Sequence, residues 1–162
     1  DDGLKLLSNL KQLKQIDLLG TQVTDAGIAE LAKLPAIESL TLVGTQLTDQ
    51  GLAELANSKS LRVLVADNTW VTDDGLKSLS ELADLEVLCI GLTRVTNRGL
   101  SHLSSLTSLK TLSLSGANVS DEGIQHLHKL KNLEQLMLNF TRVSEGEVKK
   151  LQKQLPQCDI QW

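Results

Sequence analysis

Apolar and polar residues follow a pattern along the chain that repeats every 24 residues. Glycine marks one position of each repeat, and Leu or Ile stands one and four residues after it, the spacing of one face of a helical turn. These glycines are Gly3, Gly27, Gly51, Gly75, Gly99 and Gly123. The spacing predicts a short helix at the same place in every repeat.

Further along each repeat the apolar residues stand two apart, which is the period of a β-strand. The pairs are Ile16 and Leu18, Leu40 and Leu42, Leu88 and Ile90, Leu112 and Leu114, and Leu136 and Leu138. A short helix followed by a short strand cannot bury its apolar face alone. We therefore expect the repeats to stack into an α/β solenoid.

Two polar columns accompany the apolar ones, where a column is the same position in successive repeats. Thr follows the strand at residues 21, 45, 69, 93 and 141, where its hydroxyl can satisfy backbone groups of the turn. Asp precedes the glycine by two residues at positions 1, 25, 49, 73 and 121. A column of carboxylates could bind Ca²⁺, but the motif T-D-x-G-L directly before a helix favours capping, in which the Thr or Asp side chain accepts from the first N–H groups and complements the helix dipole.

The pattern L-x-x-L-x-L-x-x-T-x-V-T-D-x-G-L-x-x-L-x-x-L, as between Leu13 and Leu34, resembles the leucine-rich repeat. It is most similar to the cysteine-containing subclass of F-box-type proteins, with Thr at the usual Cys position. The resemblance implies a right-handed α/β solenoid with a parallel sheet on its concave face and short helices on its convex face. It also implies a surface that binds other molecules.

The repeat pattern divides the chain into six coils, residues 1–146, and a C-terminal cap, residues 147–162. Pro156 is expected to stop the last helix, and the alternation of Cys158, Ile160 and Trp162 predicts a final strand. The N-terminus has no corresponding cap, so we expect the chain to be a fragment of a longer protein.

Composition excludes several functions. The chain has 35 Leu but one Phe, two Trp and no Tyr, which indicates a uniform, repeated core. A net charge of -4 with scattered basic residues argues against nucleic-acid binding, and no apolar run approaches the roughly 18 residues that span a membrane. The three His residues lack a completing ligand set, and no catalytic motif occurs. We expect no metal, no cofactor and no enzymatic activity.

The concave face and the turns beyond it are the candidate binding surface. Its centre is apolar where solvent is expected, and its rim holds most of the aromatic residues and two Arg, residue types common at binding hot spots. The candidate partner-binding residues are Val63, Val65, Asp67, Trp70, Val87, Cys89, Leu92, Arg94, Met137, Phe140 and Arg142. Six strands give a sheet of about 500 Å², short of the roughly 800 Å² per partner of a standard interface. The rim, or further N-terminal coils, must therefore contribute.

The sequence predicts a protein partner first, and leaves alternatives open. One is a glycan or small-ligand sensing or adhesion domain, although Trp70 and Phe140 lie three repeats apart, too far to hold one sugar between them. Another is a structural spacer within a larger enzyme or ubiquitin-ligase adaptor. Trp70 could also serve only as packing over the strand ends. Cys89 is expected to point outward, and a lone exposed thiol favours a reducing compartment such as the cytoplasm.

Charges alternate in sign in the column before the strands. The residues are Lys14, Glu38, Arg62, Glu86, Lys110 and Glu134. Because neighbouring strands lie about 4.8 Å apart, this column predicts a continuous row of ion pairs that opposes a slip by one coil.

Overall fold

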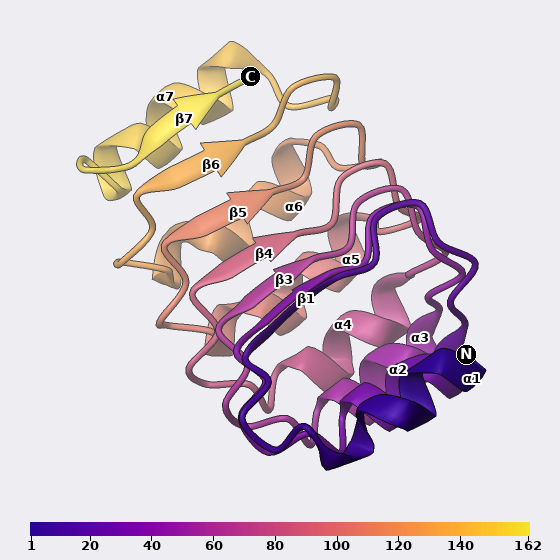
Figure 1. Ribbon diagram of the computed structural model, residues 1–162. Coiled ribbons are helices and arrows are strands. Elements are labelled where there is room, and N and C mark those ends of the chain that lie inside the picture. The colour runs from indigo at the N-terminus through magenta and orange to yellow at the C-terminus, as the bar shows by residue number, and fades with distance from the viewer.

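The computed structural model describes all residues 1–162, and it is a stack of coils with strands along one wall and helices along the other (Figure 1). Seven parallel strands form one sheet in the order in which they occur in the chain. They are β1 (Gln15–Asp17), β2 (Ser39–Thr41), β3 (Val63–Val65), β4 (Val87–Cys89), β5 (Thr111–Ser113), β6 (Gln135–Met137) and β7 (Asp159–Gln161). Each residue pairs with the residue 24 positions later, as the repeat predicts.

Short helices connect the strands on the opposite wall. The α-helices are α1 (Asp2–Lys5), α2 (Asp25–Leu31), α3 (Asp49–Leu55), α4 (Asp73–Leu79), α5 (Asn97–Leu100), α6 (Asp121–Ile124) and α7 (Glu145–Gln154). Three 3₁₀-helices follow α1, α5 and α6, namely η1 (Leu6–Asn9), η2 (Ser101–Ser105) and η3 (Gln125–Lys129). None of the helices is long and apolar enough to cross a bilayer.

The core is one cluster of 41 buried apolar residues between the sheet and the helices, and most of them are Leu. The apolar residues of both the strand period and the helix period face this core. Fully buried examples are Leu40, Leu64, Leu88 and Leu112 from the strands and Leu55 from α3. In the first coil Leu6, Leu10 and Leu19 remain exposed.

Two sets of Thr side chains, one after the strands and one directly before the helices, make the hydrogen bonds that the sequence predicts. The hydroxyl of Thr69 donates to the Ala66 carbonyl at 2.7 Å, and four other Thr residues of this column make the same bond. Thr72 precedes α4, and its side chain accepts a hydrogen bond from the Asp74 N–H. These five turns and the starts of α2 to α5 are thus fixed by local hydrogen bonds.

Of the two residue types predicted to cap the helices, Thr does so and Asp has a different role. Its carboxylates join successive coils: Asp49 accepts from the Thr72 N–H at 2.8 Å and from the Thr72 hydroxyl at 2.6 Å. The same pair of bonds recurs from Asp1, Asp25, Asp73 and Asp121, and Asn97 makes a related pair with Ser120. We call these contacts the inter-coil bridges. Thr caps α2 to α5 within their own coils, and the neighbouring Asp or Asn connects each of these coils to the next.

The glycine column is a consequence of these bridges. A Cβ on Gly99 would lie 2.5 Å from Oδ1 of Asp73, and one on Gly123 would lie 2.5 Å from Oδ1 of Asn97. The carboxylate or amide from the preceding coil occupies the space that a side chain would need. The repeat therefore requires Asp and Gly together, one in each of two neighbouring coils.

The chain terminus differs from expectation at one residue. Helix α7 ends at Gln154, before Pro156, and Cys158 and Ile160 are buried as predicted. Trp162 does not continue this alternation into the core, because β7 ends at Gln161 and the Trp162 side chain is 54% exposed. Beyond the last strand residue, no backbone pairing orients the side chain.

Candidate functional site

Four apolar residues lie together at the centre of the sheet, as predicted. Val63 pairs with Val87, and Val65 pairs with Cys89, across neighbouring strands β3 and β4. All four are half-buried, because the strands point them away from the core and their neighbours cover them in part. We call these four residues the strand block. It is an apolar surface on the concave face.

The rim is the set of turns at the carboxyl ends of the strands, and it carries exposed apolar side chains. Trp70, Leu92 and Phe140 are 56%, 64% and 93% exposed, respectively. The Arg94 guanidinium lies 4.7 Å from the Trp70 ring centroid, a cation–π contact. More than half of Trp70 faces solvent, and the alternative that it only packs over the strand ends leaves that exposed part unexplained.

The rim turns require a left-handed backbone at one column. Gly20, Gly44 and Gly116 occupy it in three coils, with φ of 66°, 67° and 72°. Leu92 and Phe140 adopt the same conformation, with φ of 53° and 61°. This conformation costs a residue with a Cβ about 1–2 kcal/mol relative to the right-handed one. Two bulky apolar residues are therefore held in solvent at an energetic cost to folding.

Leu92 and Phe140 flank a small cavity, which we call the notch. Its volume is about 370 Å³. The remaining lining residues are Asp67, Gly91, Ser113, Ser115 and Gly116. Of these, the sequence predicted Asp67 but not the glycines and serines. The sequence does contain a signal for this cavity. Gly20, Gly44 and Gly116 occupy one column, and Leu92 and Phe140 are large apolar residues in that same column.

Asp67 and Cys89 lie beside this cavity and are half-buried. The Asp67 carboxylate accepts a hydrogen bond from the Gly91 N–H at 2.6 Å, while burial raises its pKa. Burial, together with the Asp67 charge, raises the pKa of the Cys89 thiol to about 11. Cys89 points away from the core but is not the exposed thiol that its parity suggested, and at neutral pH it remains protonated and a poor nucleophile.

Two other predicted residues lie toward the C-terminal end of the surface. Met137 is half-buried on β6 and is separated from Cys89 by Ser113 on β5. Arg142 is exposed on the rim and donates a hydrogen bond to the Asn118 side chain. The candidate residues thus form three neighbouring groups: the strand block, the Trp70–Arg94 stack and the notch with its C-terminal flank.

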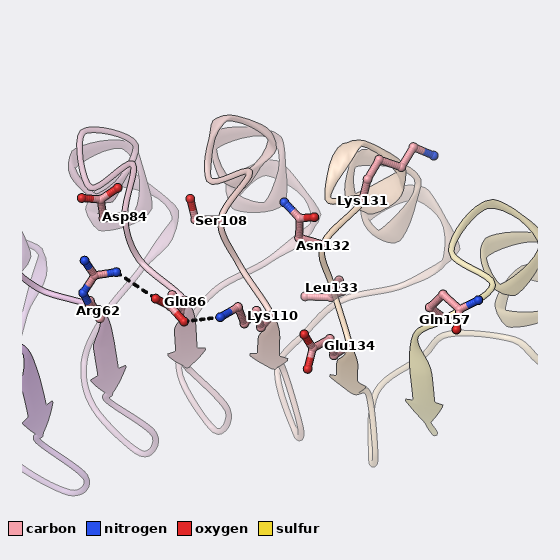
Figure 2. Close-up of a pocket in the computed structure, with 10 residues that line it drawn as sticks. All are labelled: Arg62, Asp84, Glu86, Ser108, Lys110, Lys131, Asn132, Leu133, Glu134 and Gln157. Atoms are coloured by element: carbon pink, nitrogen blue, oxygen red, sulfur yellow. Dashed lines mark hydrogen bonds and ion pairs between the residues drawn. The ribbon is translucent and has the colours of Figure 1, made fainter.

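A larger hollow, of about 560 Å³, lies at the opposite edge of the sheet, where the strands begin (Figure 2). Glu86 reaches Arg62 at 2.8 Å and Lys110 at 2.6 Å there, and Lys14 pairs with Glu38 at 2.8 Å. The predicted continuous row of ion pairs is wrong, since Glu38 does not pair with Arg62 and Glu134 forms no ion pair. Long, solvated side chains can turn toward either neighbour, so alternating charges at strand spacing do not ensure continuity.

The ion pairs of Glu86 give a prediction. Lys110 and then Arg62 lower the pKa of the Glu86 carboxyl. Its contribution to stability is therefore present above pH 4.5, the ordinary value, and is lost as pH falls through the lowered pKa. We expect Glu86→Gln to lower the melting temperature at pH 7 and low salt, with most of the loss removed by about 1 M NaCl.

The matched control is Glu134→Gln in the same column, which removes a carboxylate that has no ion pair. Thermal melts followed by circular dichroism at both salt concentrations compare the two variants. An equal loss from both, or a loss that salt does not reduce, would show that ion pairing at Glu86 does not stabilise the stack.

No group of three or more His, Cys, Asp or Glu side chains is placed to hold a metal ion.

Comparison with known proteins identifies the repeat. Residues 105–128, one complete repeat, match the family model described as Leucine Rich repeat. A search of the curated proteins found no match. The match does not extend to the cysteine-containing subclass that the sequence resembled.

Three solved structures are similar over almost the whole chain. An internalin of Listeria monocytogenes has a TM-score of 0.78 and 21% identity, covering 97% of this chain and 49% of that one. A leucine-rich-repeat protein of Leptospira interrogans has a TM-score of 0.67 and 24% identity, covering 98% and 45%. Internalin C2 of Listeria monocytogenes has a TM-score of 0.65 and 21% identity, covering 98% and 80%.

The chain spans about half the length of the first two of these proteins. The matched repeat, the 24-residue register and the single parallel sheet together show that this chain has the leucine-rich-repeat fold.

Proposed function

We propose that the chain is a non-enzymatic protein-interaction module that binds another protein on its concave face and rim. The leucine-rich-repeat fold generally mediates protein–protein interaction. The observation that carries the proposal is the apolar surface itself: the strand block adjoins a rim on which Trp70, Leu92 and Phe140 are exposed. Apolar groups exposed in one region of a surface are typical of interaction sites.

The area of a standard protein interface supports binding through both the strand block and the rim. The strands are three residues long, so the sheet alone offers less than the roughly 800 Å² per partner of a standard interface. The rim adds large side chains at the carboxyl ends of the same strands. A partner that contacts β3 and β4 therefore also meets Trp70, Arg94 and Leu92.

Binding rather than catalysis fits the chemistry of this face. Cys89 is the one thiol there, and its raised pKa of about 11 keeps it protonated.

Chain organisation is a further part of the proposal: residues 1–146 form six coils, and residues 147–162 cap their C-terminal end. In support of the cap, α7 is the longest helix and carries exposed Lys149, Lys150 and Lys153.

The test is capture of a partner from an extract of the source cells, with the chain as bait. We expect Val65→Glu and Val87→Glu to reduce capture of the partner at least tenfold, because each places a charge in the apolar strand block. The thermal melt should remain close to that of wild type, since both side chains are already half-exposed.

The matched control is Thr41→Glu, which adds the same charge at the position of β2 that pairs with Val65. This variant should retain most of the captured partner. Capture that survives in the Val variants while their stability collapses would mean that the strand block is core and that binding occurs elsewhere.

A further inference from the structure

The notch is held together by the backbone of three successive turns. The Leu92 N–H donates to the Ser115 carbonyl at 2.8 Å, and the Gly116 N–H donates to the Asn139 carbonyl at 2.8 Å. Gly116 lies between the two apolar walls, and a Cβ there would lie 2.5 Å from Cδ2 of Leu92. The space between Leu92 and Phe140 therefore depends on the absence of a side chain at position 116.

Packing does not account for the two walls. Leu92 and Phe140 are 64% and 93% exposed, and both have the left-handed backbone that Gly116 adopts without strain. Neither side chain recovers this cost by burial in the folded chain. Such strain, at a solvent-facing apolar cavity, is typical of residues held in place for a ligand.

Charge on the rim indicates which kind of ligand fits. The chain has four Arg residues; Arg62 and Arg98 form ion pairs with carboxylates. Arg94 and Arg142 form none, although the chain has a net charge of -4. These two are exposed and stand two residues after Leu92 and Phe140, on the same turns. The Arg94 guanidinium stacks on Trp70 and that of Arg142 donates to the Asn118 side chain, so neither positive charge has a carboxylate partner.

We propose that the notch binds a protein segment in which one apolar side chain is flanked by acidic residues. The apolar side chain fills the space above Gly116, and the flanking carboxylates pair with Arg94 and Arg142. This inference rests on the proposed protein-binding function and names the chemistry of the partner.

The geometry also sets the spacing and the orientation of the segment. Arg94 and Arg142 are two coils apart, about 10 Å at the spacing of parallel strands, which an extended chain spans in about three residues. Asp67 lines the inner side of the notch and keeps its carboxylate on the Gly91 N–H. It repels a second carboxylate from that side, so the acidic residues of the segment face the Arg side.

The experiment is selection of binders from a display library of random 12-residue peptides on the immobilised chain. Affinities of the enriched peptides are then measured by fluorescence polarisation. We expect enrichment of peptides with an apolar residue between acidic residues. Leu92→Gly removes one wall and retains the left-handed turn, and it should weaken their binding at least tenfold without lowering the melting temperature.

The double variant Arg94→Gln with Arg142→Gln should also weaken binding at least tenfold in low salt, with a smaller difference in high salt. Two matched controls should bind as wild type does. Asn68→Gly relaxes the same left-handed column, at φ of 54°, outside the notch. Arg98→Gln removes an Arg that is already paired.

Enriched peptides that are basic or uncharged, or whose binding is unaffected by the Leu92 and Arg variants, would overturn this inference and leave the protein-binding function standing. No enrichment over a blank support would overturn the inference and would count against protein binding as well.

Discussion

Asp49→Ala is expected to lower the free energy of unfolding by about 3 kcal/mol, because it removes two hydrogen bonds to a charged acceptor and leaves a backbone N–H without a partner. Asp49 accepts from the Thr72 N–H at 2.8 Å and from the Thr72 hydroxyl at 2.6 Å. Each coil of a solenoid is stabilised by its contacts with its neighbours. Loss of one inter-coil bridge therefore weakens the junction between two coils, and urea unfolding followed by circular dichroism measures the loss.

Asp49→Asn is the matched control, and the chain itself contains the precedent. Asn97 stands in the same column, and its Oδ1 accepts from the Ser120 N–H at 2.8 Å. An amide thus retains the bond to the backbone, and we expect a loss of about 1 kcal/mol. If Ala and Asn both cost less than about 0.5 kcal/mol, the range of an ordinary surface substitution, the bridges do not hold the coils together.

Gly99→Ala is expected to destabilise the chain by about 2 kcal/mol, although alanine favours a helix more than glycine does. The new methyl group would lie 2.5 Å from Oδ1 of Asp73 and 3.1 Å from Cδ1 of Leu76. The Asp73 carboxylate, which bonds the N–H and the hydroxyl of Thr96 at 2.7 Å each, must then move. The cost of displacing it exceeds the gain in helix propensity.

Gly146→Ala gives the opposite expectation. Gly146 lies in α7, and the atom nearest to an added Cβ is Oγ of Ser144 at 3.8 Å. Alanine should stabilise this helix by up to about 1 kcal/mol. Urea unfolding followed by circular dichroism measures the free energy of unfolding of both variants. A change of the same sign at both positions would contradict the role assigned to the glycine column.

The sequence predicted the register of the sheet residue by residue, and the reason is the unbroken 24-residue period. Once Gly3 to Gly123 are aligned, the parity of each strand follows, and with it the outward position of Val65 and the inward position of Leu64. Alignment alone cannot assign a polar contact between coils. Asp49 can satisfy its own helix or the next coil, and only the structure shows that it bonds Thr72.

Asp67, Leu92 and Phe140 of the notch could be named from the sequence, but its glycines, its serines and its shape could not. The sequence places Leu92 and Phe140 in a column of glycines, yet the cavity between them depends on a backbone conformation and on the empty position at Gly116. Charged side chains were the least predictable part. Arg62 pairs with Glu86 and not with Glu38, because a flexible, solvated side chain has two partners at the same distance along the stack.

The most direct test of the binding surface is site-specific photo-cross-linking. Benzoylphenylalanine is placed at position 70, on the rim, or at position 77, on the exposed side of α4 in the next coil, and the chain is irradiated in an extract of the source cells. We predict a cross-link to one protein from position 70 and none to that protein from position 77. Cross-linking from position 77 alone, or equally from both, would contradict binding on the concave face and rim.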